Sequence, residues 1–146
     1  MADTNFDPNK VISGTFGTLY FNLDGTDKEL ANVKKFNVKM KPTFTEFDNC
    51  NILGKCSKFC GYEIEGEFTL NRLNYNISKE FCKSWNSRKN PVLRLVAESN
   101  DPDAEGNTRV VLTGVTLEEV ALLDFEAKTL AEETYSFKAV KAEYTD

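Results

Sequence analysis

Apolar and polar residues alternate with a period of two along several segments of the chain. The clearest alternation covers residues 30–44. Its apolar face carries Phe36, Val38, Met40 and Phe44, and its polar face carries Lys35, Asn37, Lys39, Lys41 and Thr43. Residues 62–70 alternate in the same way, with Tyr62, Ile64, Phe68 and Leu70 on one face and Glu63, Glu65 and Glu67 on the other. This period predicts two β-strands, each with one buried and one solvated face.

The solvated faces of these two strands carry opposite charges, lysines on the first and glutamates on the second. If the strands pair antiparallel, opposite charges lie across from each other, and each such pair contributes about 0.2–1 kcal/mol. Two ordinary solvated faces would show the same residues, and that interpretation is compatible with the pairing.

Similar patterns predict further strands at residues 14–23, 92–97, 109–117, 120–126 and 133–144. In the last of these the inward set changes from Tyr135 and Phe137 to Val140 and Ala142, which indicates a bulge or a strand end that packs outside the domain. One helix is expected at residues 79–88, with Ser78 as its N-cap and an apolar stripe of Ile77, Phe81 and Trp85.

Two segments do not fit the strand pattern. Residues 47–61 contain several Asn and Gly residues and three of the cysteines, and we interpret them as a long interaction loop. Residues 1–10 are polar, contain Pro8 and are expected to form a flexible N-terminal arm. Residues 1–146 are therefore expected to form a single domain, mainly β with one α-helix, with two packed antiparallel sheets in a sandwich- or barrel-like arrangement.

Composition argues against enzymatic and nucleic-acid-binding functions. The chain has no histidine, so it lacks the commonest general base and the commonest metal ligand. Cys50, Cys56 and Cys60 do not show the short paired spacing of a zinc site. The acidic residues, including the pair Glu132 and Glu133, are expected on solvated strand faces or loop tips. We therefore predict no catalytic, cofactor or metal site, and no enzyme.

The net charge of -5 disfavours a surface that grips phosphates, so no specific nucleic-acid binding is expected. The N-terminal residues lack the pattern of a secretory signal, and no apolar stretch is long enough to span a bilayer. We expect a cytosolic protein with reduced thiols.

A set of local sequences resembles the tail tube proteins of contractile phage tails, of the PBSX-like prophage type. The resemblance covers nearly the whole chain, although the cysteines in and beside the segment 47–61 are not part of it. It is carried by residues 12–14 and 17–21, the turn at Asp24-Gly25, residues 33–36, 51–55 and 66–70, and finally 109–115 and 130–133.

The resemblance implies a fold similar to that of the type VI secretion tube protein. It also implies that six subunits form a ring and that rings stack into a hollow tube inside a sheath, with the sheath and baseplate proteins as further partners. Assembly would take place in the bacterial cytoplasm. The inter-subunit contacts would include the N-terminal arm, the C-terminal strand and Asn51, Ile52, Leu53 and Gly54. Glu63, Glu65 and Glu67 would line the channel together with the lysines of the neighbouring strand.

Several alternatives remain open at this stage. A small β-barrel that binds a ligand would be a stable monomer with an apolar cavity. A secretion-system tube would have nearly the same fold and mechanism. The particle could be an infectious phage or a DNA-free, bacteriocin-like particle.

Overall fold

The computed structural model describes residues 7–23, 25–30, 32–103 and 106–145. Two short 3-10 helices, Pro8–Lys10 and Gly14–Phe16, precede strand β1 (Gly17–Leu23). Strand β2 (Thr26–Glu29) returns antiparallel to β1. In the turn expected at Asp24-Gly25, Gly25 has a φ of 92° and its N–H donates to the Asn22 side chain, whereas Asp24 lies outside the described residues.

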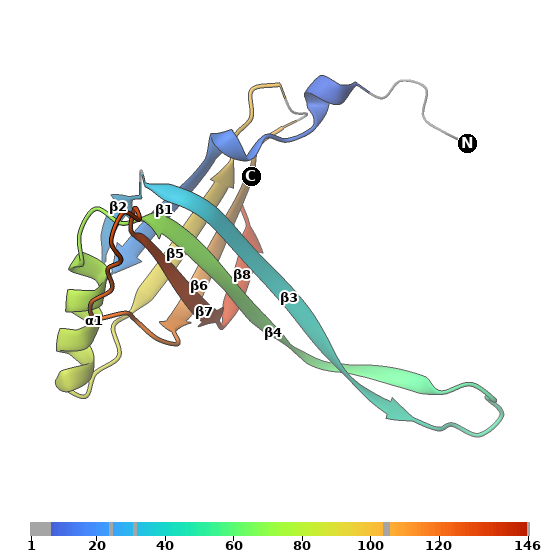
Figure 1. Cartoon of the computed structure of the whole chain (residues 1–146). Coiled ribbons are helices and arrows are strands. Elements are labelled where there is room, and N and C mark those ends of the chain that lie inside the picture. Colours follow the sequence, from blue (N-terminus) through green and yellow to red (C-terminus); the bar gives the residue numbers. More distant parts are fainter. Residues whose placement is uncertain (1–6, 24, 31, 104–105, 146) are drawn as a thin grey trace.

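The rest of the chain forms β3 (Val33–Phe47), β4 (Cys56–Asn71), α1 (Asn76–Asn86), β5 (Leu93–Ser99), β6 (Thr108–Leu117), β7 (Glu132–Ala139) and β8 (Lys141–Tyr144). The strands are antiparallel in the order β2-β1-β5-β6-β7-β4-β3, and β8 also pairs with β6. Figure 1 shows α1 beside one end of the sheet and the β3–β4 hairpin projecting far beyond it.

The structure confirms a mainly β fold with one α-helix, and its two layers belong to one antiparallel sheet that is not closed. Strand β6 joins the layers. Most of its length pairs with β5 and β8, and its last two residues, Thr116 and Leu117, pair with β7. A single strand that changes partners along its length lets one sheet fold over and cover itself.

The core lies between these layers. Phe68 is fully buried and contacts Tyr135 and Phe137, with ring centroids 5.3 and 6.0 Å apart. The other layer contributes Leu19, Leu95 and Leu112, all buried. Burial of each such side chain stabilises the fold by about 1.5–3 kcal/mol. Of the apolar faces predicted for the two alternating segments, Ile64, Phe68 and Leu70 lie in the core and Phe36 and Val38 pack against it. Met40, Phe44 and Tyr62 are exposed, because no second layer covers that end of the two strands.

The helix begins three residues earlier than predicted. Ser78 is not its N-cap: Ser78 lies inside the helix, is buried, and places its hydroxyl 3.4 Å from that of Tyr135. Instead, the Asn74 side chain accepts a hydrogen bond from the Asn76 N–H at 3.0 Å. One of the N–H groups that the first turn of a helix leaves unpaired is therefore satisfied by a residue that precedes Ser78.

The strand predicted at residues 120–126 is absent, because the chain leaves the sheet after Leu117. In the segment 118–131, Leu122 and Leu123 line a pocket together with residues of α1. The Tyr75 hydroxyl donates to the Asp124 carbonyl at 2.7 Å and accepts from the Asp124 N–H at 3.3 Å. These two bonds use the backbone groups of Asp124 that a sheet would have used.

The break predicted in the last strand lies at Val140. The chain pairs with β4 up to Ala139 and then pairs with β6 from Lys141. Gly114 faces the break with a φ of 66°, and a Cβ on it would lie 2.8 Å from a methyl group of Val140. A side chain at position 114 would therefore obstruct this crossing.

The long loop predicted at residues 47–61 is shorter in the structure, because Phe47 and residues 56–61 belong to strands. Strand β3 continues to Phe47 and β4 begins at Cys56, so only residues 48–55 connect them. We call residues 42–62 the hairpin arm, because pairing between β4 and β7 ends at Ile64 opposite Ala139. Pro42 lies on the edge strand β3, the kind of strand in which proline is tolerated.

Candidate functional site

The hairpin arm is a two-stranded ribbon with apolar side chains exposed to solvent. Phe44 pairs with Phe59, and their rings meet edge to face with centroids 6.0 Å apart. Cys60 is the additional residue of a bulge that Gly61, with a φ of 152°, accommodates. The exposed apolar residues in and beside the arm are Met40, Phe44, Phe47, Ile52, Leu53, Phe59 and Tyr62.

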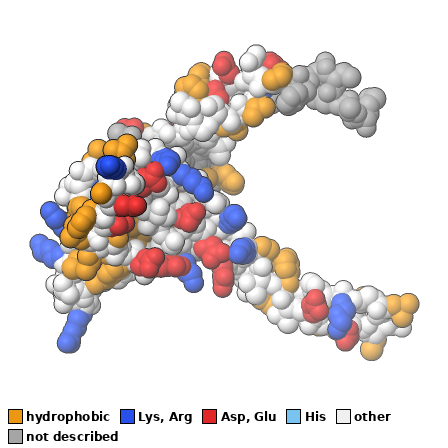
Figure 2. All heavy atoms as spheres, viewed as in Figure 1, with side chains coloured by type: hydrophobic (Ala, Val, Ile, Leu, Met, Phe, Trp, Pro, Cys, Tyr) orange, Lys and Arg blue, Asp and Glu red, His pale blue; other side chains and the backbone are white. Residues whose placement is uncertain are grey.

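Figure 2 shows such side chains near the base and at the tip of the arm. Exposed fractions range from 44% for Tyr62 to 109% for Leu53. Concentrated exposed apolar area of this kind marks an interaction surface.

The residues predicted to contact other subunits lie together at the tip of the arm. Asn51, Ile52, Leu53 and Gly54 are all exposed, and Asn51 adopts a φ of 68°. The Ile52 N–H donates to the Asn49 carbonyl at 3.3 Å, which closes the turn. The fold thus presents these four residues outward, and their contact with another subunit stays a prediction.

The charged faces of β3 and β4 pair as the sequence suggested. Lys39 lies opposite Glu65 and Lys41 lies opposite Glu63 in the register. The closest ion pair is diagonal, with Lys41 Nζ 2.8 Å from a Glu65 oxygen. The hydrogen bond from Lys41, followed by its positive charge, lowers the pKa of Glu65, and the same bond raises the pKa of Lys41.

This face, which we call the ladder face, is not acidic overall. It continues onto β7 with Lys138 and onto Glu118, the residue after β6, whose N–H donates to the Ser136 carbonyl at 2.9 Å. Its charges balance, because it carries Lys35, Lys39, Lys41 and Lys138 against Glu63, Glu65, Glu67 and Glu118. That Glu63, Glu65 and Glu67 line the channel stays a prediction. The lysines that were expected to share their face do lie on it.

The sheet has open edges. Strand β3 is one end of the strand order and β2 is the other. An unpaired strand edge offers backbone N–H and C=O groups to any other strand, and proteins normally cover or block such edges. The long free edge of β3 is therefore a second feature that favours association.

The N-terminal segment is partly described. Residues 1–6 of the predicted flexible arm lie outside the described residues. Residues 8–10 form a 3-10 turn capped by Asp7, and the Ser13 N–H donates to Asp101 at 2.9 Å. Val11 and Ile12 are 60% and 58% exposed on a segment that leaves the sheet in Figure 1.

A buried polar cluster under α1 was missed by sequence reasoning, which expected Glu133 on a solvated surface. Glu133 is 6% exposed and lies 3.2 Å from the Arg72 guanidinium, which also stacks on Tyr75. The Tyr135 hydroxyl donates to Glu133 at 2.6 Å. Burial and this bond raise the pKa of Tyr135. The inward period of Glu133, Tyr135 and Phe137 was the signal that could have revealed the burial of Glu133.

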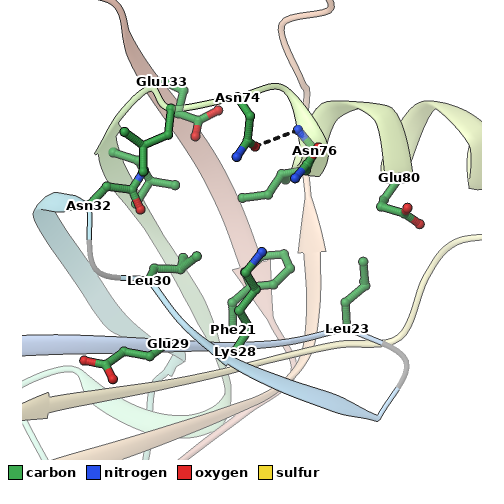
Figure 3. Close-up of a pocket in the computed structure, with 13 residues that line it drawn as sticks. Phe21, Leu23, Lys28, Glu29, Leu30, Asn32, Asn74, Asn76, Glu80 and Glu133 are labelled. Atoms are coloured by element: carbon green, nitrogen blue, oxygen red, sulfur yellow. Dashed lines mark hydrogen bonds between the residues drawn. The ribbon is translucent and has the colours of Figure 1, made fainter.

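A cavity of about 510 Å³ lies between β2 and α1. Figure 3 shows Phe21, Leu23 and Leu30 on one side of it and Asn74 and Asn76 on the other. Its size falls within the range of small-molecule sites. It is not the interior of a ligand-binding barrel, because the sheet is not closed.

The described residues contain no group of three or more Cys, Asp or Glu that could hold a metal ion. None of the helices in the described part of the chain is long and apolar enough to span a lipid bilayer.

The family model described as "Phage tail tube protein" matches residues 4–146. The chain therefore belongs to the phage tail tube protein family, as the resemblance predicted. No curated protein matches the sequence significantly.

Solved structures of tail components share the fold. The tube-terminating cap of the anti-feeding prophage gives a TM-score of 0.66 at 7% identity, with 99% of each chain covered. The sheath-tube complex of an extracellular contractile injection system gives 0.62 at 5% identity, covering 87% of each chain. The tail of a gene transfer agent particle, solved with C6 symmetry, gives 0.56 at 8% identity, covering 92% of this chain and 98% of the other. At this identity the similarity shows the fold alone. The family and the fold together identify a structural tail tube component.

Proposed function

We propose that this protein is the subunit of the inner tube of a contractile phage tail or a related particle, in which six copies form a ring and rings stack. The open sheet with its projecting arm is the observation that carries the proposal. A head-to-tail contact that closes on itself makes a ring, and it would cover the exposed edge of β3 in every copy. The C6 symmetry of the similar gene transfer agent tail supports the number six.

The hairpin arm provides the contact between rings in this proposal. It projects beyond the sheet and ends in Ile52 and Leu53, which are 50% and 109% exposed. Sheath and baseplate proteins are the further partners, and assembly in the bacterial cytoplasm precedes release in the particle. The role is structural, with no catalytic step.

The ladder face is the surface that we assign to the channel. Its paired charges require water, whereas the opposite face of the same strands forms the core. A wall whose lysines and glutamates balance in number would let a polyanion pass without binding it. A variant with Glu63→Cys as its sole cysteine, labelled with a small gold particle, should show density along the axis of the tube. Density on the outer surface would contradict the assignment.

Electron microscopy of the assembled protein tests the main proposal. The purified chain, or particles from producing cells if an initiator is required, should show hollow tubes with six-fold end views that contain this chain. Leu53→Ser should prevent or shorten the tubes and leave the melting temperature of the monomer unchanged. Leu123→Ser is the control, because it changes another exposed leucine, 70% exposed and beside α1. If Leu53→Ser gives tubes of normal length, the tip of the arm is not part of the interface.

A further inference from the structure

The cavity between β2 and α1 has walls that the fold holds in place. Its apolar side chains come from β1, β4, α1 and the end of β2, and the two most enclosed, Phe21 and Leu70, are 5% and 1% exposed. The Leu30 N–H donates to the Leu19 carbonyl at 2.9 Å, which ties the residue after β2 to β1. A hollow of about 510 Å³ that is formed before any ligand enters is the usual form of a small-molecule site.

The cavity has a polar end and an apolar end. Figure 3 shows Glu133, Asn32 and Asn74 together at one end, with Phe21 on the opposite side. The polar end is also fixed, because the Asn32 side chain donates to the Asn71 carbonyl at 2.6 Å and the Asn71 N–H donates to the Asn32 carbonyl at 2.9 Å. An apolar body with a few placed polar groups is the pattern that orients a small ligand.

Glu133 is the buried charged group at the polar end. Its Oε2 accepts a hydrogen bond from the Tyr135 hydroxyl at 2.6 Å and lies 3.2 Å from Arg72 Nη1. No described residue donates a hydrogen bond to its other oxygen, Oε1. Oε1 is not sealed inside the protein, because the buried side-chain atoms without a hydrogen-bond partner in the described part of the chain are two nitrogens of Arg72. Since Glu133 lines the cavity, Oε1 is left as an acceptor for a group that enters it.

The charges already present decide the head group of a ligand. Arg72 compensates Glu133, so an ammonium group beside Oε1 would be a second buried cation without a partner of its own. The charged residues that line the cavity are Glu29, Glu80, Glu133 and Lys28. With three carboxylates against one ammonium group, a ligand anion is repelled on balance. A neutral O–H or N–H group instead donates a charge-assisted hydrogen bond to Oε1 and leaves the ion pair intact.

We propose that this cavity binds a small neutral molecule with an apolar body and a hydroxyl or N–H group that donates to Glu133 Oε1. The body lies against the apolar side chains of the cavity, which are Phe21, Leu23, Leu30, Leu70, Leu73 and Ile77. The site shares no residue with the hairpin arm or the ladder face, so the inference goes beyond the proposed function and does not depend on it. A ligand that binds the folded chain alone also stabilises it.

An NMR titration of the monomer with 2-naphthol, naphthalene and 2-naphthoate tests the site, because the probes share one ring system and differ in the group they present to Glu133. 2-Naphthol should shift the methyl resonances of Leu23 and Ile77 in a saturable way. The methyl resonances of Leu122 and Leu123, which line a separate groove beside α1, should stay unchanged. The Kd of 2-naphthol should be about ten-fold or more below that of naphthalene, the ratio expected for one hydrogen bond to a charged group. 2-Naphthoate should bind more weakly than 2-naphthol.

A substitution that fills the cavity provides the second test. Ile77→Trp should abolish the saturable shifts, because the larger side chain occupies the space of the ligand. Lys79→Trp is the matched control on the same helix, since Lys79 lines the separate groove, and it should change the Kd of 2-naphthol by less than about two-fold. If Ile77→Trp does not fold, the comparison of 2-naphthol with naphthalene decides alone.

The outcomes that overturn the proposal are distinct. Equal Kd values for 2-naphthol and naphthalene would show that Glu133 does not accept a bond from the ligand. Tighter binding of 2-naphthoate, or of the cation 2-naphthylmethylamine, would refute a neutral head group. Saturable shifts at Leu122 and Leu123 in place of Leu23 and Ile77, or no shifts at all, would show that the cavity is not the site.

Discussion

Gly66 is the position where the smallest change has the largest expected effect. It lies in β4 opposite Val38 on β3. A Cβ at this position would overlap the Asn37 carbonyl oxygen, and would lie 2.8 Å from Phe137 Cζ and 2.9 Å from Val38 Cα. Two of these three obstacles are backbone atoms of the neighbouring strand, which cannot move without breaking the β3–β4 ladder.

The Gly66→Ala variant should therefore lose stability toward the upper end of the usual range for overpacking. That range is about 1–3 kcal/mol, and we expect about 3 kcal/mol because rotation of a side chain cannot relieve the overlap. For a domain of this size, such a loss lowers the melting temperature by roughly 10 °C.

Urea unfolding of the monomer, followed by circular dichroism, measures the free energy of unfolding. Gly54→Ala is the control, because a Cβ there meets nothing within 4 Å, and its effect should stay within about 0.5 kcal/mol. If Gly66→Ala costs less than about 1 kcal/mol with an unchanged slope, β3 does not approach β4 as closely as the structure shows.

Three further predictions concern polar groups. Arg72→Met should destabilise the monomer by about 3–5 kcal/mol in urea unfolding, because it leaves the Glu133 carboxylate buried without its cation; a loss below about 1 kcal/mol would contradict this. The raised pKa of Tyr135 means that its contribution to stability is complete below the ordinary tyrosine pKa of about 10 and is lost as the pH rises above it. The parent should therefore lose more stability than Tyr135→Phe between about pH 9.5 and 11, and parallel curves would refute this. Lys41→Met should raise the pKa of Glu65 toward its ordinary value in an NMR titration, and an unchanged midpoint would show that the ion pair does not form in solution.

The alternation in residues 30–44 and 62–70 was sufficient to predict two strands, the residues that share each face, and the complementary charges that now pair across the ladder. The change of inward set near Val140 was likewise visible, because a shift in a period-two pattern requires a break in the strand. The tail tube family was also recognisable from local sequences along the chain.

Other features depended on contacts between distant segments. Residues 56–61 have the Gly and Cys content of a loop, yet they form a strand because residues 43–47 lie alongside them. Residues 120–126 have the pattern of a strand, yet hydrogen bonds to Tyr75 hold them beside the helix. Glu133 is a charged residue of a type usually found at the surface, yet it is buried in an ion pair with Arg72.

The sequence by itself therefore determined which side chains share a face, since that follows from the two-residue repeat of an extended chain. Only the tertiary structure decided which faces are covered, because the cover comes from elements distant in sequence. For Phe36 and Phe68 the cover is the other layer of the sheet, and the same apolar face continues onto the arm, where Phe44 and Phe59 lie beyond the last strand that could cover them.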